Sequence, residues 1–496
     1  MMRRERISTD RKGRADILLS AAWSRTEKLL LTFVCELTVF FAIITPPFQA
    51  PDENQHYMKA MALTQGQVFV QRRGEAVGAE LPLSALAIHS VDFPTDTPPV
   101  LRLFKMEQID RSRSADTKRP GMNFADYPNV ASYAPSLYAP GAAGLLLGQA
   151  LSQTRIDAFY TGRLVNALTG LALLIAALCL MPFGRNAMLA TALLPTFAYQ
   201  TGSLSPDAVI NGIGFLGLAL ALRIGFMGAT PARTGALLIA APILALAKGV
   251  YLPLIAAGLR WPQHRGDLRP ALILGITAIS AATFLFWMHL SGGSQILYHI
   301  QSRKTGETMM TAPLRDQLAL ILADPSAFAR ILISSITERA PVYTLQIVGR
   351  FGWNAILLPL LAYPLAVLML GSGIAGGNGA HFGMLQRLWW LLIALGVALL
   401  IETAMYLTGT PLGADYIQGT QGRYFLPVLP LALIALSPAQ PIRGAQRLLM
   451  FSAITLGSIA AVSAYDSFWV HGFITSDGMP PHQSIVRALL LPSPRW

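Results

Sequence analysis

The chain has 496 residues, of which 53% are hydrophobic and only 13% are charged, and its mean hydropathy is +0.47. Soluble domains carry roughly 25% charged residues, so this composition excludes an ordinary soluble protein and indicates a multi-pass membrane protein. The net charge of +12 does not indicate nucleic-acid binding. The basic residues fall mostly in an N-terminal arm and in short loops between apolar runs, where they orient a membrane protein.

The N-terminal arm, residues 1–28, carries eight Lys or Arg residues against four acidic ones, so we expect it to stay in the cytoplasm. The apolar run that follows is longer than the roughly 7–15 residues of a signal-peptide core. We therefore predict a retained first helix over 27–47, which opens a membrane domain spanning 29–466. The only cysteines, Cys35 and Cys179, exclude a disulfide framework beyond that one pair and exclude a zinc site of the usual spacing.

Directly after the first apolar run comes the segment Thr45-Pro-Pro-Phe-Gln-Ala-Pro-Asp-Glu-Asn-Gln-His56. Its three prolines end the helix, because proline has no N–H to donate and disfavours helix at the residue before it. Asp52, Glu53 and His56 are thereby held close to the bilayer. Two simpler roles stay open: the carboxylates could cap a helix that begins near Asn54, and His56 could be a histidine satisfied within an interface.

A long segment without a secure membrane span follows, over residues 48–160. We expect a large extracytoplasmic loop over 48–132, with an amphipathic helix from Asn54 to Gln67 lying along the membrane surface. The apolar stretch within 133–152 is short and interrupted by prolines, so we predict an interfacial helix there. Counting it as a span would place most of the later loop arginines outside, against the positive-inside rule.

The remaining apolar runs predict an all-α polytopic membrane protein with about eleven transmembrane helices and an extracytoplasmic C-terminal tail over 467–496. We expect amphipathic helices in a second extracytoplasmic segment over 290–352, a plain inner linker between Gly371 and Gly383, and no internal repeat. After the first helix, the predicted spans are 163–182, 187–204, 207–227, 234–247, 249–260, 270–289, 354–371, 388–407, 424–437 and 449–466.

This topology gathers polar residues from distant parts of the chain at one face. Asp207 begins a helix there, Lys248 lies at the turn between two short apolar runs, and Arg423 begins a late span together with its neighbours Gln421 and Tyr424. Glu402 lies near the end of the preceding span. An ionisable residue within or beside a span is costly and usually faces a polar cavity or a partner.

Each of these residues also has a simpler explanation. Asp207 could favour the positive end of its helix dipole, and Lys248 could extend to the lipid head groups. Arg423 and Tyr424 could anchor the interface, and Glu402 could pair with a neighbouring helix. The functional interpretation depends on all of them facing one compartment.

Such a cluster suits transfer from a lipid-linked phosphate. A carboxylate near a low-dielectric boundary is a better general base for an acceptor hydroxyl, and we select Asp52 for this role, with Glu53 as the alternative. Lys248 and Arg423 would hold a phosphate and stabilise the charge that grows on it as it leaves. Asp52, Glu53 and Asp207 could also hold a divalent metal ion, although the sequence does not require one.

The order of several short motifs resembles a bacterial multi-pass "predicted membrane protein" family of unknown function, over about residues 30–465. That family in turn resembles the GT-C membrane glycosyltransferases, which implies a GT-C-like fold. Besides the segment ending at His56, the motifs are Tyr133-Ala-Pro-Ser-Leu-Tyr-Ala-Pro140, Leu204-Ser-Pro-Asp-Ala208, Leu246-Ala-Lys-Gly-Val-Tyr251, Gly349-Arg-Phe-Gly-Trp353 and Gln421-Gly-Arg-Tyr-Phe-Leu-Pro427.

The resemblance implies an enzyme of the bacterial inner membrane that uses a polyprenyl-phosphate-linked sugar. Asp52 and Glu53 match the acidic motif of the first outer loop by position, with a role as base or metal contact, and Asp207 matches a later acidic residue that contacts donor or metal. The chain lacks a separate Asp-x-Asp motif.

The leading hypothesis is a glycosyltransferase acting on the outer side on a cell-envelope glycan or lipid. The alternatives are a lipid-linked-sugar transporter or flippase, and a non-catalytic subunit that binds other proteins of envelope biosynthesis. Among the site residues, His56, Glu402 and Gln421 are the secondary candidates.

Overall fold

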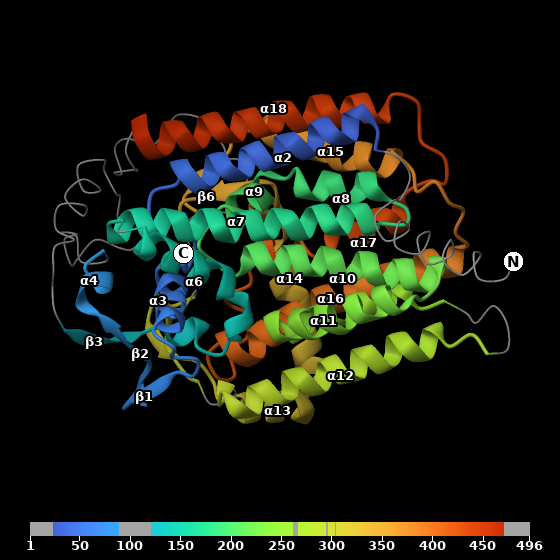
Figure 1. Cartoon of the computed structure of the whole chain (residues 1–496). Helices are drawn as coiled ribbons and strands as arrows, with labels where there is room; N and C mark the ends of the chain where they lie inside the picture. Colours follow the sequence, from blue (N-terminus) through green and yellow to red (C-terminus); the bar gives the residue numbers. More distant parts are fainter. Residues whose placement is uncertain are drawn as a thin grey trace, which may run out of the picture.

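The structure, a computed structural model, describes residues 23–88, 121–151, 153–260, 266–293, 296–302 and 304–470. Long helices run side by side along one common direction, and short helices and strands gather at one end of them (Figure 1). The long and apolar helical elements are α2 (Arg25–Ile44), α7 (Arg155–Leu180), α10 (Asp207–Met227), α11 (Pro231–Ala247), α12 (Arg269–Leu290), α14 (Pro325–Val348), α15 (Ala362–Ala375), α16 (Met384–Gly409) and α18 (Ala445–Tyr465), which continues into η7 (Asp466–Val470).

Five helical stretches of the described chain are long and apolar enough to cross a bilayer, namely α7, α10, α12, α16 and 445–469. A sixth is added if α13 (Leu314–Ala323) and α14, which meet at a bend of 107°, form one span. The predicted number of eleven is not confirmed. The predicted first span, α2, has 20 residues but carries several charged side chains near its start and is not among the five.

Several predicted spans are broken into short pieces by proline. The predicted span 187–204 consists of α8 (Arg185–Ala192) and α9 (Pro195–Thr201), because Pro195 holds Leu194 in an extended conformation. The run after Lys248 forms the 3-10 helix η4 (Gly249–Gly258), which contains a proline. The predicted span 424–437 divides into η6 (Gly422–Phe425) and α17 (Leu429–Leu436).

The predicted span 354–371 begins with strands instead of a helix. β6 (Arg350–Phe351) pairs antiparallel with β7 (Ile356–Leu357) across a tight turn, and α15 starts only at Ala362. Trp353 and Asn354 in this turn have φ of 53° and 65°, a conformation that excludes them from a right-handed helix.

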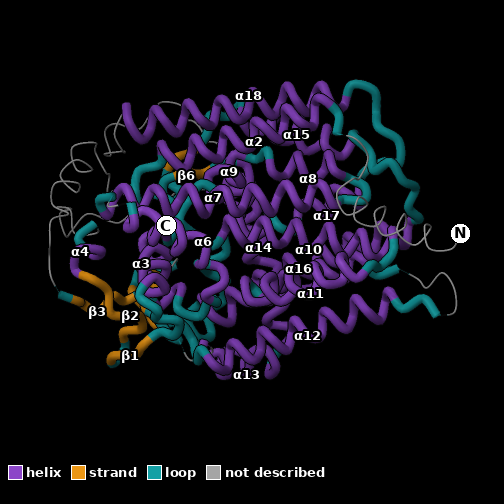
Figure 2. Tube along the Cα trace, viewed as in Figure 1, coloured by secondary structure: helices purple, strands orange, loops and turns teal. Residues whose placement is uncertain are grey.

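The described residues within 48–150 form a small layer at one end of the bundle, which includes a three-stranded sheet (Figure 2). β2 pairs antiparallel with both neighbours, with Gly78 opposite Gln71 and Asp126. The sequence did not predict this sheet. The layer contains β1 (Gln71–Arg73), β2 (Ala76–Pro82), α4 (Leu83–Leu86), β3 (Met122–Asp126), η2 (Pro128–Val130), η3 (Pro135–Leu137), α3 (Glu53–Thr64) and α6 (Ala139–Ala150).

The two longest helices of this layer are α3 and α6. α6 has 12 residues, too few for a span, as expected. It packs closely on α7, since a Cβ at Gly144 would lie 2.7 Å from the Gly162 Cα. The predicted surface helix is α3, but Tyr57, Ala60, Met61 and Ala62 on it are buried. Part of α3 therefore packs against β2 and α6, and its orientation along the membrane surface stays a prediction.

The segment 290–352 contains β4 (His299–Gln301), β5 (Thr308–Met310), α13 and α14. The β4–β5 hairpin is antiparallel, with His299 opposite Met310, and it docks on the loop after α16 through a hydrogen bond from Gln418 Nε2 to the Gln301 carbonyl over 2.6 Å. Helices in this segment were expected; the hairpin was not.

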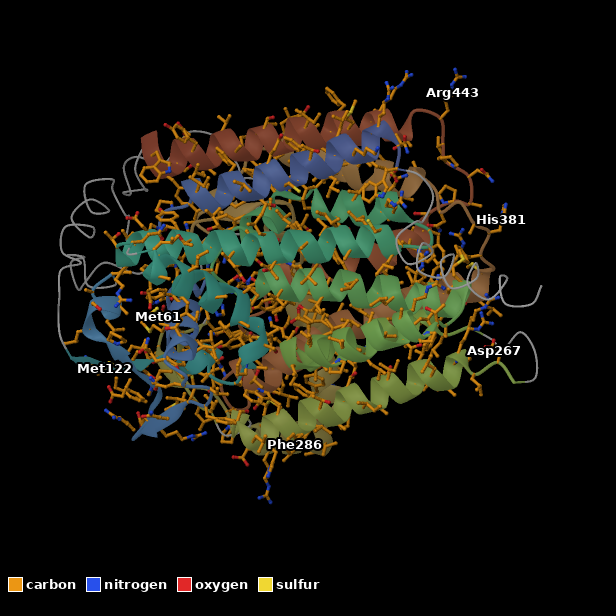
Figure 3. The ribbon with its side chains drawn as sticks, in the orientation of Figure 1. Met61, Met122, Asp267, Phe286, His381 and Arg443 are labelled. Carbon is orange, nitrogen blue, oxygen red and sulfur yellow. The ribbon has the colours of Figure 1, made fainter. Side chains whose placement is uncertain are left out.

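The loops with most of the arginines lie at the end of the bundle opposite the small layer. Figure 3 labels Arg443, His381 and Asp267 at that end, and Met61 and Met122 at the other. Arg387 Nη1 donates to the Ser437 carbonyl over 2.7 Å, which ties two of these loops together. Arm residues 1–22, Arg265 and tail residues 471–496 lie outside the described residues.

Candidate functional site

The loop between α2 and α3 holds Asp52 in an uncommon backbone conformation. Phe48 and Asp52 both have φ of 63°, in the left-handed region that side chains other than glycine rarely adopt. The Gln49 carbonyl accepts from Tyr199 Oη over 2.7 Å and from the Trp353 amide over 3.1 Å. The Asp52 side chain makes no capping hydrogen bond to α3, so the capping role does not hold for this residue.

Arg423 joins Asp52 to Asp207. Its Nη2 lies 2.9 Å from Asp52 Oδ2 and its Nη1 lies 2.9 Å from Asp207 Oδ2. Gln200 Oε1 and the Pro51 carbonyl also accept from Nη1, over 3.2 and 3.5 Å. The guanidinium is buried, so it is not an interfacial anchor, and Asp207 does more than favour its helix dipole. Three predicted residues, distant in sequence, thus form one ion-paired cluster.

The backbone around Arg423 is fixed by neighbouring elements. The Gly422 amide donates to Gln346 Oε1 over 2.7 Å, and a Cβ at this glycine would lie 2.5 Å from the Tyr343 carbonyl oxygen. Tyr251 Oη donates to the Tyr424 carbonyl over 2.8 Å. η6 is therefore held against α14 on one side and η4 on the other, which sets the position of the guanidinium.

Lys248 lies between α11 and η4 in an extended conformation. Its Nζ is 3.3 Å from the centroid of the Tyr424 ring and 6.0 Å from that of Tyr133, a cation–π arrangement. The ammonium donates no hydrogen bond to the described residues. Because it faces the rings and the cavity described next, the structure does not support extension to lipid head groups.

These residues line a cavity of about 310 Å³ at the end of the bundle that carries the small layer. Its polar wall includes Asp52, His56, Ser132, Tyr133, Asp207, Lys248, Tyr298, Gln418, Gln421, Arg423 and Tyr424. Its apolar wall includes Met288, Ile296, Ile300, Ala312, Leu314, Met405 and Leu407. The lining of the cavity therefore combines two acidic and two basic side chains with several aliphatic ones.

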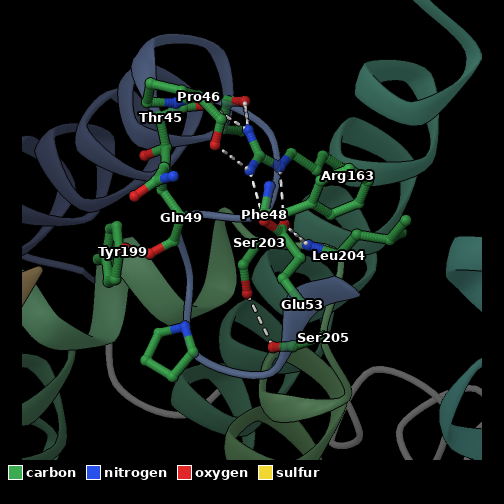
Figure 4. Close-up of polar contacts among 12 residues, drawn as sticks. Thr45, Pro46, Phe48, Gln49, Glu53, Arg163, Tyr199, Ser203, Leu204 and Ser205 are labelled. Atoms are coloured by element: carbon green, nitrogen blue, oxygen red, sulfur yellow. Dashed lines mark hydrogen bonds and ion pairs between the residues drawn. The ribbon is translucent and has the colours of Figure 1, made fainter. Parts of the chain in front are cut away.

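Glu53 is not brought into this cavity, although it follows Asp52 directly. Its carboxylate is completely buried and forms a bidentate pair with Arg163, with distances of 2.8 and 2.6 Å (Figure 4). It also accepts from the Phe48 and Leu204 amides, over 3.1 and 2.7 Å. Arg163 in turn donates to the carbonyls of Thr45 and Pro46. Glu53 thus ties the start of α3 to α7 and to the loop before α10.

His56 lines the cavity from α3. Its Nδ1 lies 2.9 Å from Tyr138 Oη, and its ring stacks on Tyr133 with centroids 6.3 Å apart. Burial lowers the pKa of His56 well below its usual value, and the nearby charges of Arg423, Lys248 and Lys59 lower that pKa further. The imidazole is therefore neutral near pH 7. One ring nitrogen of His56 has a hydrogen-bond partner, and the side chain also borders the cavity.

The two remaining candidates lie on either side of the cavity wall. Gln421 is part of the lining, whereas Glu402 lies behind it and accepts from Thr420 Oγ1 over 2.9 Å. Glu402 therefore supports the loop that leads to Arg423, which agrees with the expectation of a partner from a neighbouring segment.

Several residues that shape the site were not predicted. Arg163 had a usable signal, because an arginine inside an apolar run demands a partner, and the same rule had selected Glu402. Gln200 and Trp353 carry no such signal, since a glutamine or tryptophan in an apolar segment is common. Lys59 carried a weak sequence signal, because it is a charged residue within a predicted amphipathic helix. In the structure its Nζ donates to the Val130, Ala131 and Tyr133 carbonyls over 2.6–2.8 Å and fixes the segment that holds Tyr133.

The side chains do not suit a divalent metal ion held by Asp52, Glu53 and Asp207. Glu53 is committed to Arg163, and the Arg423 guanidinium lies between the other two carboxylates. Within the described ranges, no three His, Cys, Asp or Glu side chains come together as a metal-binding group.

The family described as "Predicted membrane protein (DUF2142)" matches residues 35–432. The chain belongs to this family. The match contains Asp52, Asp207, Lys248 and Arg423 and confirms the resemblance expected from the motifs. It also establishes the chain as a membrane protein of a family without an assigned function. A search of curated proteins finds no match.

Among solved structures, the oligosaccharyltransferase of Archaeoglobus fulgidus, described in complex with Zn and sulfate, is similar at 11% sequence identity with a TM-score of 0.34. The alignment covers 94% of this chain and 58% of the oligosaccharyltransferase chain. The similarity is weak and extends over little more than half of the larger protein.

Proposed function

We propose that this protein is a glycosyltransferase of the bacterial inner membrane that moves a sugar from a polyprenyl-phosphate donor to a cell-envelope glycan or lipid. The observation that carries the proposal is one cavity whose lining contains a carboxylate, Asp52, an amine, Lys248, and several aliphatic side chains.

The cations of the cavity suit the phosphate of such a donor. The Lys248 ammonium has no hydrogen-bond acceptor among the described residues, and neither has the Arg423 Nε hydrogen. A buried donor without an acceptor is unfavourable, so a phosphate oxygen at either would be stabilised. The hydroxyls of Tyr133, Tyr298 and Tyr424 add polar contacts for a sugar.

The apolar wall suits the lipid part of the donor. Met288, at the end of α12, and Met405, near the end of α16, line it together with residues of the β4–β5 hairpin. α12 and α16 are both candidate membrane spans. A polyprenyl chain lying between lipid and cavity would bury its isoprene units against these side chains, while the phosphate reaches Lys248.

In the proposed reaction Asp52 is the general base. Its Oδ2 is paired with Arg423, whereas no described residue donates to its Oδ1, and the side chain is 26% exposed. The acceptor hydroxyl oxygen bonds to the anomeric carbon as the bond from that carbon to the phosphate oxygen breaks. The bonding electrons leave with the phosphate, beside Lys248, and Asp52 takes the hydroxyl proton.

The orientation follows from the distribution of arginine. The loop that holds Arg443 lies at the end opposite the cavity (Figure 3), and short cytoplasmic loops are enriched in Lys and Arg. The cavity would then open outside the cytoplasm, with the N-terminus inside and the tail outside. A variant lacking Cys35 and Cys179, with cysteine at Ser132 or Arg443, tests this: an impermeant maleimide should label intact cells only at position 132.

The decisive experiment measures sugar transfer from synthetic polyprenyl-phosphate sugars by the purified chain. Asp52→Asn should lower the rate by about 10²–10⁴-fold, the usual contribution of a general base. Asp267→Asn, the same change at the opposite end, is the control and should retain the wild-type rate. Equal rates for Asp52→Asn and wild type would remove Asp52 from the mechanism.

The same preparation separates the alternative functions. A transporter or flippase would move a labelled polyprenyl-phosphate sugar across a liposome membrane without transferring it. A non-catalytic subunit would do neither, and it would still capture its envelope-biosynthesis partner when Asp52 is replaced. Neither result is expected from a carboxylate and a phosphate-binding cation in one cavity.

A further inference from the structure

We infer that the Arg423 guanidinium takes the position of a divalent cation between Asp52 and Asp207, so that the site works without a metal ion. The part of this inference that concerns the reaction rests on the proposed function. The part that concerns the cation does not, and it is tested separately.

The geometry gives each terminal nitrogen of Arg423 one carboxylate. Nη2 donates to Asp52 and Nη1 to Asp207, each over 2.9 Å. Two partly buried carboxylates that flank one guanidinium would repel each other without that cation between them, and Arg423 supplies the charge. Arginine does not deprotonate in proteins, so the charge is present at every pH at which the protein is folded.

The guanidinium is also held in place. Gln200 Oε1 accepts from Nη1, the η6 backbone is fixed through Gln346 and Tyr251, and the side chain is buried. Moving it aside for a metal ion would leave a buried charge without its partners, which is strongly unfavourable. A divalent ion bound to the same two oxygens would in addition be repelled by the guanidinium.

The charges of the cavity balance without a metal. Asp52 and Asp207 are negative and Arg423 is positive, and a protonated Lys248 brings the sum of the four side chains to zero before the donor binds. Burial lowers the pKa of Lys248 to about 7, so this balance is complete below about pH 7. Burying a net charge is costly, and a divalent ion would add two positive charges to this neutral group. Lys248 then has the role that a metal would otherwise perform, stabilising the leaving phosphate.

The first measurement is Mn²⁺ binding to the EDTA-treated full chain in detergent, by the loss of the free-ion paramagnetic resonance signal. Mn²⁺ binding by the wild-type protein should not decrease in Asp52→Asn or in Asp207→Asn, because neither carboxylate holds a metal ion. Arg423→Gln should gain Mn²⁺ binding, because it leaves two unpaired carboxylates facing one site, and Arg423→Gln with Asp207→Asn should lose it again. No sugar or transfer reaction enters this measurement.

The second measurement is transfer with and without EDTA, which should proceed at the same rate. Wild-type Mn²⁺ binding that is lost in Asp207→Asn would overturn the inference, as would an EDTA-sensitive rate restored by Mn²⁺. A folded Arg423→Gln protein that gains no Mn²⁺ site would also contradict the inference that the guanidinium occupies the position of a metal ion. Absence of any transfer activity would contradict the proposed function, while the Mn²⁺ result would still decide the cation.

Discussion

The indole Nε1 of Trp353 donates to the Phe48 carbonyl over 2.7 Å, and both residues have a left-handed backbone, with φ of 53° and 63°. Such conformations in residues other than glycine cost about 1–3 kcal/mol each and persist where surrounding structure enforces them. The β6–β7 turn and the loop before α3 therefore stabilise each other. Asp52 lies four residues after Phe48, so this contact also sets the position of Asp52.

This contact predicts that Trp353→Phe lowers the transfer rate while the protein stays folded. The loss of one hydrogen bond should reduce the free energy of unfolding by about 1 kcal/mol, but displacement of Asp52 should lower kcat at least about tenfold with little change in KM. Trp389→Phe is the matched control, because the Trp389 indole also donates to a carbonyl, that of Ala256, over 3.0 Å. It should lose similar stability and no activity; equal rates for both variants would contradict a positioning role.

The Glu53–Arg163 pair should contribute to the free energy of unfolding and take no part in the transfer reaction. Glu53→Gln leaves a buried guanidinium without its anion, so we expect the free energy of unfolding to fall by about 3–5 kcal/mol. The control is Glu80→Gln, which breaks the exposed Arg73–Glu80 pair and should change it by less than about 1 kcal/mol. Denaturant unfolding in mixed micelles measures both. Similar decreases in the free energy of unfolding of the two variants would show that the buried pair stabilises the fold no more than the exposed pair does.

Lys248 should bind the donor phosphate. Lys248→Gln removes the charge but keeps a polar side chain, and we expect donor affinity to fall about 10- to 100-fold, the equivalent of 1.5–3 kcal/mol for a charged hydrogen bond. Lys304→Gln provides the comparison, because Lys304 also lies over a tyrosine ring, 5.2 Å from the Tyr416 centroid, yet pairs with Asp415. Titration with a polyprenyl phosphate should separate them; unchanged affinity in Lys248→Gln would assign the phosphate elsewhere.

Stability should depend on pH through His56. Burial lowers the pKa of His56 well below 6.5 in the folded chain, so below pH 6.5 the unfolded state binds a proton that the folded state does not. The contribution of His56 to the free energy of unfolding is then fully present above about pH 6.5 and falls by up to about 1.4 kcal/mol per pH unit below it. Burial lowers the pKa of Lys59 and Lys248 to about 7, so their contributions change mainly at higher pH. Comparing unfolding at pH 7.5 and 5.5 tests this. His56→Gln should show a smaller loss, and an identical loss would assign the pH dependence to other groups.

Much of the site was predictable because a membrane makes polar residues informative. Asp207, Lys248 and Arg423 stand out at the edges of apolar runs, where charges are expensive, and the structure places all three on one cavity. The same reasoning was incomplete for Glu53, since a sequence cannot show which of two adjacent carboxylates turns toward a buried arginine. It also treated proline-broken runs as full spans, because hydropathy measures apolar length and not the continuity of a helix.

Composition, proline positions and motif order are local properties, so they were enough to identify a membrane protein, its family, and acidic residues after a proline-terminated first apolar run. The pairing of Asp52 and Asp207 with Arg423, the pairing of Glu53 with Arg163, and the position of Lys248 at the cavity without an acceptor depend on the packing of distant segments. These pairings join residues more than 100 positions apart, and the packing of the bundle, which no local pattern encodes, chooses the partners.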